Sequence, residues 1–286
     1  MDKWAHCTWA RPLRARCVAS WQWTINASHA LRQNSYFMIV PGYRFWLVLG
    51  ACAGLGGAGL VWNQTHTNRL ETELLTLLPD EVPRHPDLVK LAVAEAKPIY
   101  AAHCASCHGP ERKGNPQIGA PDLSDNVWLY GTGSVVDIER TILYGIRSGH
   151  GQSHNVAEMP AFGLSGMLTP GEIGDVVQYV LSLNHRANLA QAALSGQTIF
   201  AEKGTCGDCH GPDGRGDPYY GSSNLTINVW NNGGDAASLY RSIYYGLQRV
   251  CPAWYGVIPL EKIRALAVYL HAISPGPPAA YAAAAS

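Results

Sequence analysis

Cys104-Ala105-Ser106-Cys107-His108 recurs 102 residues later (206 minus 104) as Cys206-Gly207-Asp208-Cys209-His210. Two thiols at this spacing can add across the vinyl groups of a haem, and the histidine that follows is held beside the iron as a ligand. The pattern is typical of covalent haem c attachment. It predicts two haem c cofactors, and the residues that bind them are Cys104, Cys107 and His108 for the first and Cys206, Cys209 and His210 for the second.

Two other uses of a Cys-x-x-Cys pair fit this sequence less well. A zinc ribbon usually combines two such pairs that lie about 15–20 residues apart, whereas about 100 residues intervene here. A thioredoxin-like redox pair requires a strand before it and a helix after it, and it gives no reason for a histidine to follow both pairs. Covalent haem is therefore favoured over both.

The charge balance argues against nucleic acid as a partner. The 286 residues include 21 basic and 21 acidic side chains, so no net field attracts a polyanion. Charged residues make up 15% of the chain, with 30 Gly and 18 Pro, which is typical of compact domains joined by many turns. Four cysteines lie outside the pentapeptides, and their spacing suggests no disulfide framework: Cys7, Cys17, Cys52 and Cys251.

An apolar segment predicts one membrane-spanning helix at residues 45–63. Its first 18 residues carry no charge and follow directly on Arg44, which is the short end of the length that crosses a bilayer. Six basic residues and a single acidic residue precede it, whereas both signs are mixed after it. The positive-inside rule then places an N-terminal tail, 1–44, in the cytoplasm and the rest of the chain beyond the inner membrane, in the bacterial periplasm.

A lipoprotein cleavage site is the competing interpretation of this segment. Leu49-Gly50-Ala51-Cys52 resembles a cleavage box that would remove residues 1–51 and lipidate Cys52. Few apolar residues separate Arg44 from this box, and the apolar run continues for ten residues past Cys52. A continuous span is therefore favoured.

The chain repeats itself beyond the pentapeptides. The segments 119–123 and 221–225, and then Asn126-Val127-Trp128 and Asn228-Val229-Trp230, keep the same offset of 102 residues. Two homologous domains are therefore expected at 93–188 and 190–275. A linker at 64–92, with three prolines, separates them from the span, and a flexible tail follows at 276–286.

Each repeat is expected to be a small all-α domain. An N-terminal helix, 91–104 or 192–206, leads into the pentapeptide, and a middle helix follows at 136–144 or 236–245. A closing helix shows apolar residues at i, i+3, i+4 and i+7 in both repeats. Tyr179 and Tyr269 occupy matching places on the closing helices, and we expect each to pack against an N-terminal helix.

Met159 is the expected sixth ligand of the first haem. It lies in the turn Glu158-Met159-Pro160-Ala161-Phe162-Gly163, and a thioether there would complete a His/Met iron site of raised potential. Met167 is a rival, but it directly precedes a helix start and is better explained as packing. His150 and His154 lie in the same loop and are further candidates.

Cys251 stands at the corresponding place in the second repeat, in the turn Val250-Cys251-Pro252-Ala253-Trp254, and no methionine follows Met167. The possible axial groups for the second iron are therefore Cys251, water and His271. The hypothesis is that Cys251 binds as a thiolate, which would give a haem of much lower potential than the first. A five-coordinate or water-bound iron beside a buried Cys251 thiol is the open alternative.

The motifs together resemble the dihaem subunit, subunit III, of cbb3-type cytochrome c oxidases. The resemblance covers residues 41–275. It rests on the tandem pentapeptides and five further segments: PGYRFW at 41–46, GAPDLSDNVWLYG at 119–131, EMPAFG at 158–163, CPAW at 251–254 and LAVYLHAI at 266–273. It implies one transmembrane helix followed by two tandem class I cytochrome c domains.

The resemblance also implies a function. Members of this family are periplasmic, membrane-anchored electron conduits that perform no bond chemistry of their own. They take electrons from a soluble or membrane cytochrome c donor and pass them, through a monohaem cytochrome c subunit, toward the haem-copper catalytic subunit. By position, Cys104, Cys107, His108 and Met159 would serve one haem, and Cys206, Cys209 and His210 the other.

Two departures and two alternatives accompany this resemblance. Residues 1–40 lack the Gly-His and Trp-Asp-Gly pattern usual before the span, and the second methionine is missing. A stand-alone dihaem cytochrome serving a periplasmic dehydrogenase or reductase is one alternative. A dihaem enzyme whose second iron binds a small ligand is another, although Arg249 is the only ionisable close neighbour of Cys251 in the sequence.

Overall fold

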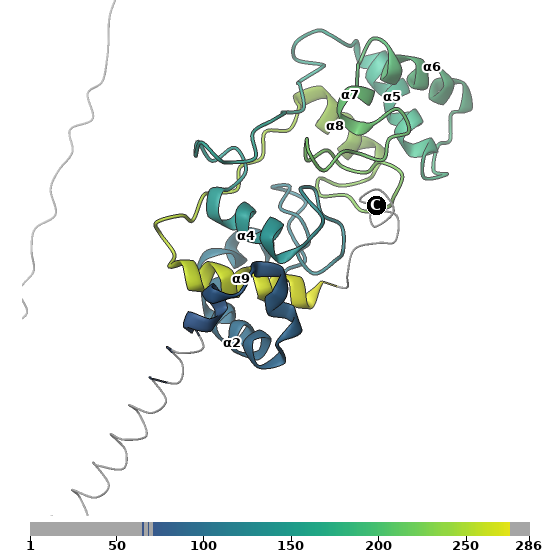
Figure 1. Ribbon diagram of the computed structural model, residues 1–286. Helices are drawn as coiled ribbons and strands as arrows, with labels where there is room; N and C mark the ends of the chain where they lie inside the picture. The colour runs from purple at the N-terminus through teal and green to yellow at the C-terminus, as the bar shows by residue number, and fades with distance from the viewer. Residues whose placement is uncertain (1–64, 66–67, 69–70, 275–286) are drawn as a thin grey trace, which may run out of the picture. The chain divides into compact units, whose positions relative to one another are not determined.

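The computed structural model describes residues 65, 68 and 71–274. Within this part the secondary structure is helical, and β-pairing is confined to isolated bridges (Figure 1). This confirms the helix-rich fold expected from the sequence. The elements are η1 (Pro79–Arg84), α2 (Pro86–His103), α3 (Ala105–His108), α4 (Val135–Tyr144), α5 (Pro170–Ser182), α6 (Ala190–Ala201), α7 (Gly207–His210), α8 (Ala236–Tyr245) and α9 (Leu260–Ile273).

The starts of α4, α5 and α8 follow from local capping chemistry. Ser134 and Asp235 cap α4 and α8, because each side chain accepts a hydrogen bond from a backbone N–H in the first turn. Thr169 and Glu172 form a reciprocal capping box at the start of α5. Gly145 and Gly246, at φ +72° and +70°, end α4 and α8 in the left-handed region. The expected middle helices therefore form almost as predicted.

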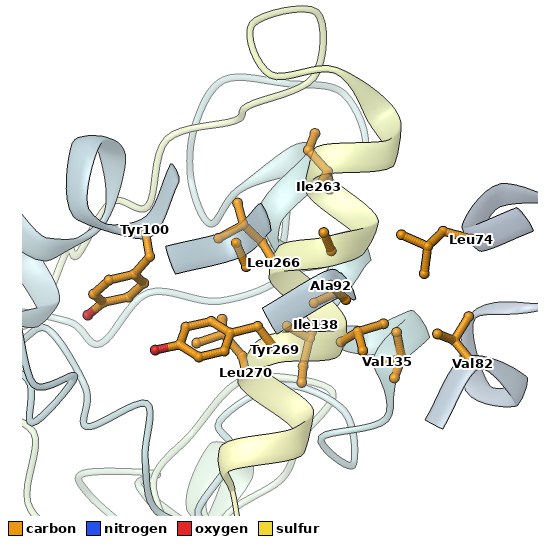
Figure 2. Packing of buried hydrophobic residues seen from close by; sticks show 14 of the residues in the cluster. Leu74, Val82, Ala92, Tyr100, Val135, Ile138, Ile263, Leu266, Tyr269 and Leu270 are labelled. Atoms are coloured by element: carbon orange, nitrogen blue, oxygen red, sulfur yellow. The ribbon is translucent and has the colours of Figure 1, made fainter. Parts of the chain in front are cut away.

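The first helical bundle combines η1, α2 and α4 with the C-terminal helix α9. Its buried core includes Ala92 and Tyr100 from α2 and Val135 and Ile138 from α4. From α9 come Ile263, Leu266, Tyr269 and Leu270, and Figure 2 shows these side chains pointing at those of α2, α4 and the linker. Helix α9 therefore closes the bundle that carries the first pentapeptide.

The second helical bundle combines α5 with α6 and α8. Its core joins Ile173, Val176 and Val180 of α5 to Phe200 of α6 and Leu239 of α8. In Figure 1, α5 lies with α6, α7 and α8, whereas the yellow α9 lies beside the blue α2. Helix α5, which belongs to the first repeat, therefore closes the bundle that carries the second pentapeptide.

The two closing helices are thus exchanged between the repeats. Tyr179 packs edge-on against Phe200, with ring centroids 5.1 Å apart, and Tyr269 packs against Tyr100 at 6.3 Å. Each tyrosine contacts an N-terminal helix, as expected, but that helix belongs to the other repeat. The expectation that each repeat is closed by its own C-terminal helix is corrected accordingly. Hydrophobic periodicity indicates that a helix face is buried, but it does not identify the helix against which that face packs.

A short connection explains why α5 packs on α6. Only residues 183–189 separate the two helices, so the closure entropy of this αα-hairpin is small. Gln178 accepts hydrogen bonds from the backbone N–H groups of Asn188 and Leu189, and Lys203 pairs with Glu172 at 2.5 Å. That contact with Lys203 is the main reason why the pKa of Glu172 falls to about 2. Local contacts therefore hold α5 against the second repeat.

Gly196 permits the close approach of α5 and α6. A Cβ at this position would collide with the backbone carbonyl of Asp175 on α5. Gly174, also on α5, has nothing within 4 Å of an added Cβ. The close packing of α5 on α6 therefore requires a glycine at position 196 but not at position 174.

A buried ion pair ties α9 to α4 and to the linker. Arg264, in the middle of α9, pairs with Glu139 of α4, and its Nη1 donates to the backbone carbonyls of Leu74 (2.8 Å) and Leu77 (3.1 Å). Nearby, Lys262 pairs with Glu71 at 2.5 Å and with Glu95 at 2.7 Å. The linker that precedes the repeats is therefore attached to the C-terminal helix.

In the described part of the chain, no helix has both the length and the apolar character needed to cross a membrane. The expected span at 45–63 lies outside that part, as do the N-terminal tail and the tail after residue 274.

Replacing Glu139 by Ala should lower the free energy of unfolding by about 3–5 kcal/mol, because it leaves the Arg264 guanidinium buried without its counter-charge. Chemical denaturation monitored by circular dichroism measures the change. Glu202→Ala, at an exposed position in the other bundle, should change stability by less than about 0.5 kcal/mol. Equal effects of the two substitutions would contradict the role of the buried pair.

Gly196→Ala should destabilise the protein by about 1–3 kcal/mol, because the added methyl group forces α5 and α6 apart. The matched change Gly174→Ala should stabilise it by about 0.5–1 kcal/mol, since alanine favours a helix interior. Thermal unfolding of the two variants checks both signs. If Gly196→Ala proved neutral, α5 would not pack on α6.

Candidate haem sites

Both pentapeptide histidines are fixed in the same way. Helix α3 carries His108, and its Nδ1 lies 3.0 Å from the backbone carbonyl oxygen of Pro121; helix α7 carries His210, whose Nδ1 lies 2.9 Å from that of Ser223. A carbonyl only accepts, so Nδ1 carries the proton and Nε2 keeps a free lone pair. This is the tautomer and the orientation that a metal-binding imidazole needs.

The surroundings also keep the two imidazoles neutral. Burial lowers the pKa of His108, and the hydrogen bond to Pro121 opposes this only in part. Burial likewise lowers the pKa of His210 against the opposing bond to Ser223. Each histidine is therefore in the uncharged form that binds iron.

The pentapeptide thiols lie beside these histidines. Burial, with the charges of Cys251 and Cys107, raises the pKa of Cys104 to about 11, and burial raises that of Cys206 to about 11. Burial raises the pKa of Cys209 as well. Cys104 and Cys206 pack against different cores, so the structure does not bring the two pairs together as a four-cysteine zinc site.

Met159 lies in the bundle of the second pentapeptide. It packs, together with Cys206, against the core built from α5, α6 and α8. Its backbone carbonyl accepts a hydrogen bond from the N–H of Leu247, just after α8, at 3.2 Å. Phe162, three residues later, donates its N–H to the carbonyl of Ile243 at 3.1 Å. The Met159 turn is therefore attached to the second repeat.

Cys251 lies in the bundle of the first pentapeptide. Its backbone exchanges two hydrogen bonds with Ile146, just after α4, at 2.9 and 3.0 Å. Trp254, three residues later, donates to the carbonyl of Ile142 at 3.1 Å and packs against the same core as Cys104. Burial, with the nearby Cys107, raises the pKa of the Cys251 thiol to about 11.

The two sulfur-bearing turns are structural equivalents. Ile146 follows the glycine that ends α4, and Leu247 follows the glycine that ends α8. Each pairs with the sulfur residue of the other repeat, Cys251 or Met159. Cys251 therefore occupies, in the first bundle, the place that Met159 occupies in the second.

This placement changes the expected pairing of groups. From the sequence, we expect His108 and Met159 to bind one iron, and His210 and Cys251 to bind the other. In the structure, Cys251 lies with the first pentapeptide and Met159 with the second. The physical reason is the exchange of α5 and α9. The Met159 turn directly precedes α5 and the Cys251 turn directly precedes α9, so each turn lies in the bundle that its helix closes.

The rival donors differ in their surroundings. Met167 is 46% exposed. The Nδ1 of His271, on α9, lies 2.9 Å from the carbonyl oxygen of Gly133, which fixes the orientation of its ring. His150 stacks on Tyr144, with ring centroids 4.8 Å apart, and His154 stacks on Tyr130 at 4.3 Å.

Two arginines add to the fit for haem, and neither was predicted from the sequence to bind it. The Nε atoms of Arg112 and Arg249 are buried and have no hydrogen-bond acceptor among the described residues. Arg112 also donates from Nη1 to the Tyr269 hydroxyl at 2.7 Å, and Arg249 donates from Nη2 to Asn232 at 2.8 Å. Buried guanidinium groups require acceptors, and haem carries two carboxylates. An arginine four residues after the first pentapeptide histidine was the available sequence signal.

Comparisons with known proteins agree with this chemistry. The cytochrome c family model matches residues 93–184, and the model for subunit III of cbb3-type cytochrome c oxidase matches residues 191–270. The matched segments are the two sequence repeats, and they indicate covalently bound haem c at both sites.

Several curated relatives extend the match. The oxidase subunit FixP of Bradyrhizobium sp. (strain ORS 278) is 40% identical over 197 residues, which is 68% of this chain and 66% of the relative. CcoP of Cereibacter sphaeroides is 34% identical over 72% of this chain and 68% of its own length. A CcoP of Rhodobacter capsulatus is 32% identical over 90% of this chain and 89% of its own length. The chain belongs to the family of cbb3-type cytochrome c oxidase subunits that contains FixP and CcoP.

Proposed function

We propose that this chain relays single electrons as the dihaem subunit of a cbb3-type terminal oxidase. The observation that carries the proposal is the duplicated site, in which a Cys-x-x-Cys pair, a histidine of fixed tautomer and a sulfur-bearing turn lie in one bundle. When bound, each haem iron supplies a reversible one-electron couple. The chain itself needs no acid or base for this role, and no catalytic residue is assigned.

The chain's own residues have defined roles in this proposal. Cys104, Cys107, Cys206 and Cys209 attach the two haems, and His108 and His210 bind the irons. Met159 supplies a thioether, which favours the reduced iron and raises the potential of its site. The buried aliphatic and aromatic side chains of the two bundles limit access of water to the irons, which also affects the potential.

The membrane anchor is part of the same proposal. The alignment with the Rhodobacter capsulatus relative covers 90% of this chain and therefore takes in residues 45–63. The apolar composition of that segment and the basic residues before it support a single span with a cytoplasmic N-terminus. Both haem bundles would then lie in the periplasm of a bacterium, attached to the inner membrane.

The proposed partners follow from the names of the relatives, which are subunits of cbb3-type oxidases. The haem-copper catalytic subunit and a monohaem cytochrome c subunit would receive the electrons, and a soluble or membrane-bound cytochrome c would supply them. A stand-alone cytochrome that serves a periplasmic dehydrogenase or reductase is the alternative outcome of the test.

The test begins with purification of the full-length protein from the native membrane. We expect haem-copper subunits to co-purify, and we expect the Cys206→Ala/Cys209→Ala variant to hold one haem per chain and to lose oxygen consumption driven by reduced cytochrome c. Cys7→Ser/Cys17→Ser, which changes cysteines outside the haem motifs, should retain both haems and full activity. A chain that purifies with a dehydrogenase and without haem-copper subunits would contradict the oxidase assignment.

A further inference from the structure

We propose that the Sγ atom of Cys251 would bind, as a thiolate, the iron of the haem attached to Cys104 and Cys107. The first iron would then have a histidine from one repeat and a sulfur ligand from the other. This inference rests on the proposed haem content, and it assigns a role that the sequence hypothesis had placed at the second iron.

The backbone geometry carries the first step. Cys251 exchanges two hydrogen bonds with Ile146, and the Trp254 N–H binds the Ile142 carbonyl. The Met159 turn is held at the end of α8 in a similar way: the Leu247 N–H donates to the Met159 carbonyl, and the Phe162 N–H donates to the Ile243 carbonyl. If Met159 serves the second iron from this position, the same register brings the Cys251 side chain to the first.

The surroundings of Cys251 carry the second step. Trp254, three residues after Cys251, packs edge-on against His103, the residue before Cys104, with ring centroids 4.9 Å apart. The Cys251 thiol also interacts electrostatically with Cys104 and Cys107. Cys251 donates only a weak contact to the carbonyl of Pro252, at 3.9 Å, so its sulfur lone pairs are not engaged.

Other donors are less well placed in the described structure. Met159 is held on the second repeat. The Nδ1 of His150 accepts a hydrogen bond from the Gln152 N–H at 3.1 Å, and the Nε2 of His154 lies 3.2 Å from the Thr141 hydroxyl. The turn that carries Cys251 packs, through Trp254, against the same core as Cys104.

The chemistry of ligation balances without any redox partner. The Cys251 S–H bond breaks, the sulfur forms a bond to ferric iron, and the proton leaves to solvent, so the iron keeps its oxidation state. A thiolate donates strongly to ferric iron and stabilises it, whereas the thioether of Met159 favours the ferrous state. The first site therefore has the lower potential, and electron transfer from the first site to the second runs downhill.

The test is low-temperature electron paramagnetic resonance of the oxidised, purified full-length protein, combined with a potentiometric titration. We expect two low-spin signals, one of the thiolate type and one of the His/Met type. Cys251→Ala should remove the thiolate signal and leave the other unchanged. Cys251→Met should replace it with a second His/Met signal and raise the potential of that haem toward the other.

Val250→Ala, at the exposed neighbouring position, is the matched control and should leave both signals and both potentials unchanged. A wild-type spectrum without a thiolate signal, or a Cys251→Ala spectrum identical to the wild type, overturns the ligation. Preparations that lack covalent haem altogether would instead contradict the proposed function, so the two failures are distinguishable.

Two milder variants assign the thiolate to one haem. Tyr100→Phe removes a hydrogen bond to the Gly109 carbonyl, next to His108, and should shift the thiolate signal only. Ser222→Ala removes a bond to the Cys209 carbonyl and should shift the His/Met signal only. The reverse result would place Cys251 at the second iron and overturn the exchanged arrangement.

Discussion

The packing of α5 on α6 is the contact on which the remaining arrangement depends. Because seven residues join the two helices, α5 is held beside the second repeat at little entropic cost. The first repeat then lacks a closing helix, and α9 fills that place against α2 and α4. The Met159 turn precedes α5 and the Cys251 turn precedes α9. The packing of α5 and α9 therefore also places the Met159 turn in the bundle of the second pentapeptide and the Cys251 turn in the bundle of the first.

Much of the local structure could be predicted from the sequence. The pentapeptides, the repeat offset and the middle helices are encoded by residues close together in the chain, such as the capping Ser134 and Asp235. Helix partners are encoded differently. The apolar faces of α5 and α9 are similar, and periodicity alone does not distinguish between two similar grooves. Gly196 was one sequence signal for the packing of α5 on α6, since a glycine inside a helix often marks close approach of another backbone.

The buried Arg264 was a second sequence signal, in this case for the packing of α9 on α4. A charged side chain within an otherwise apolar stretch of α9 requires a counter-charge, and Glu139 of the first repeat provides it. An ion pair is more selective than an apolar face, because α5 has no arginine at any position and would leave Glu139 unpaired in the same groove. The pair therefore helps to specify α9 as the partner of α4, in addition to any effect on stability.

The exchange has a consequence for electron transfer. Each candidate site takes its attachment cysteines and histidine from one repeat and its sulfur turn from the other, so neither site is complete within one repeat. A displacement of α9 would move the Cys251 turn at the first site, and a displacement of α5 would move the Met159 turn at the second. If the two sulfur residues bind the irons as proposed, helix packing and the potential difference between the two sites are linked, because the ligand affects the potential. Arg264 joins the linker to the same bundle, because it binds the Leu74 and Leu77 carbonyls as well as Glu139 of α4.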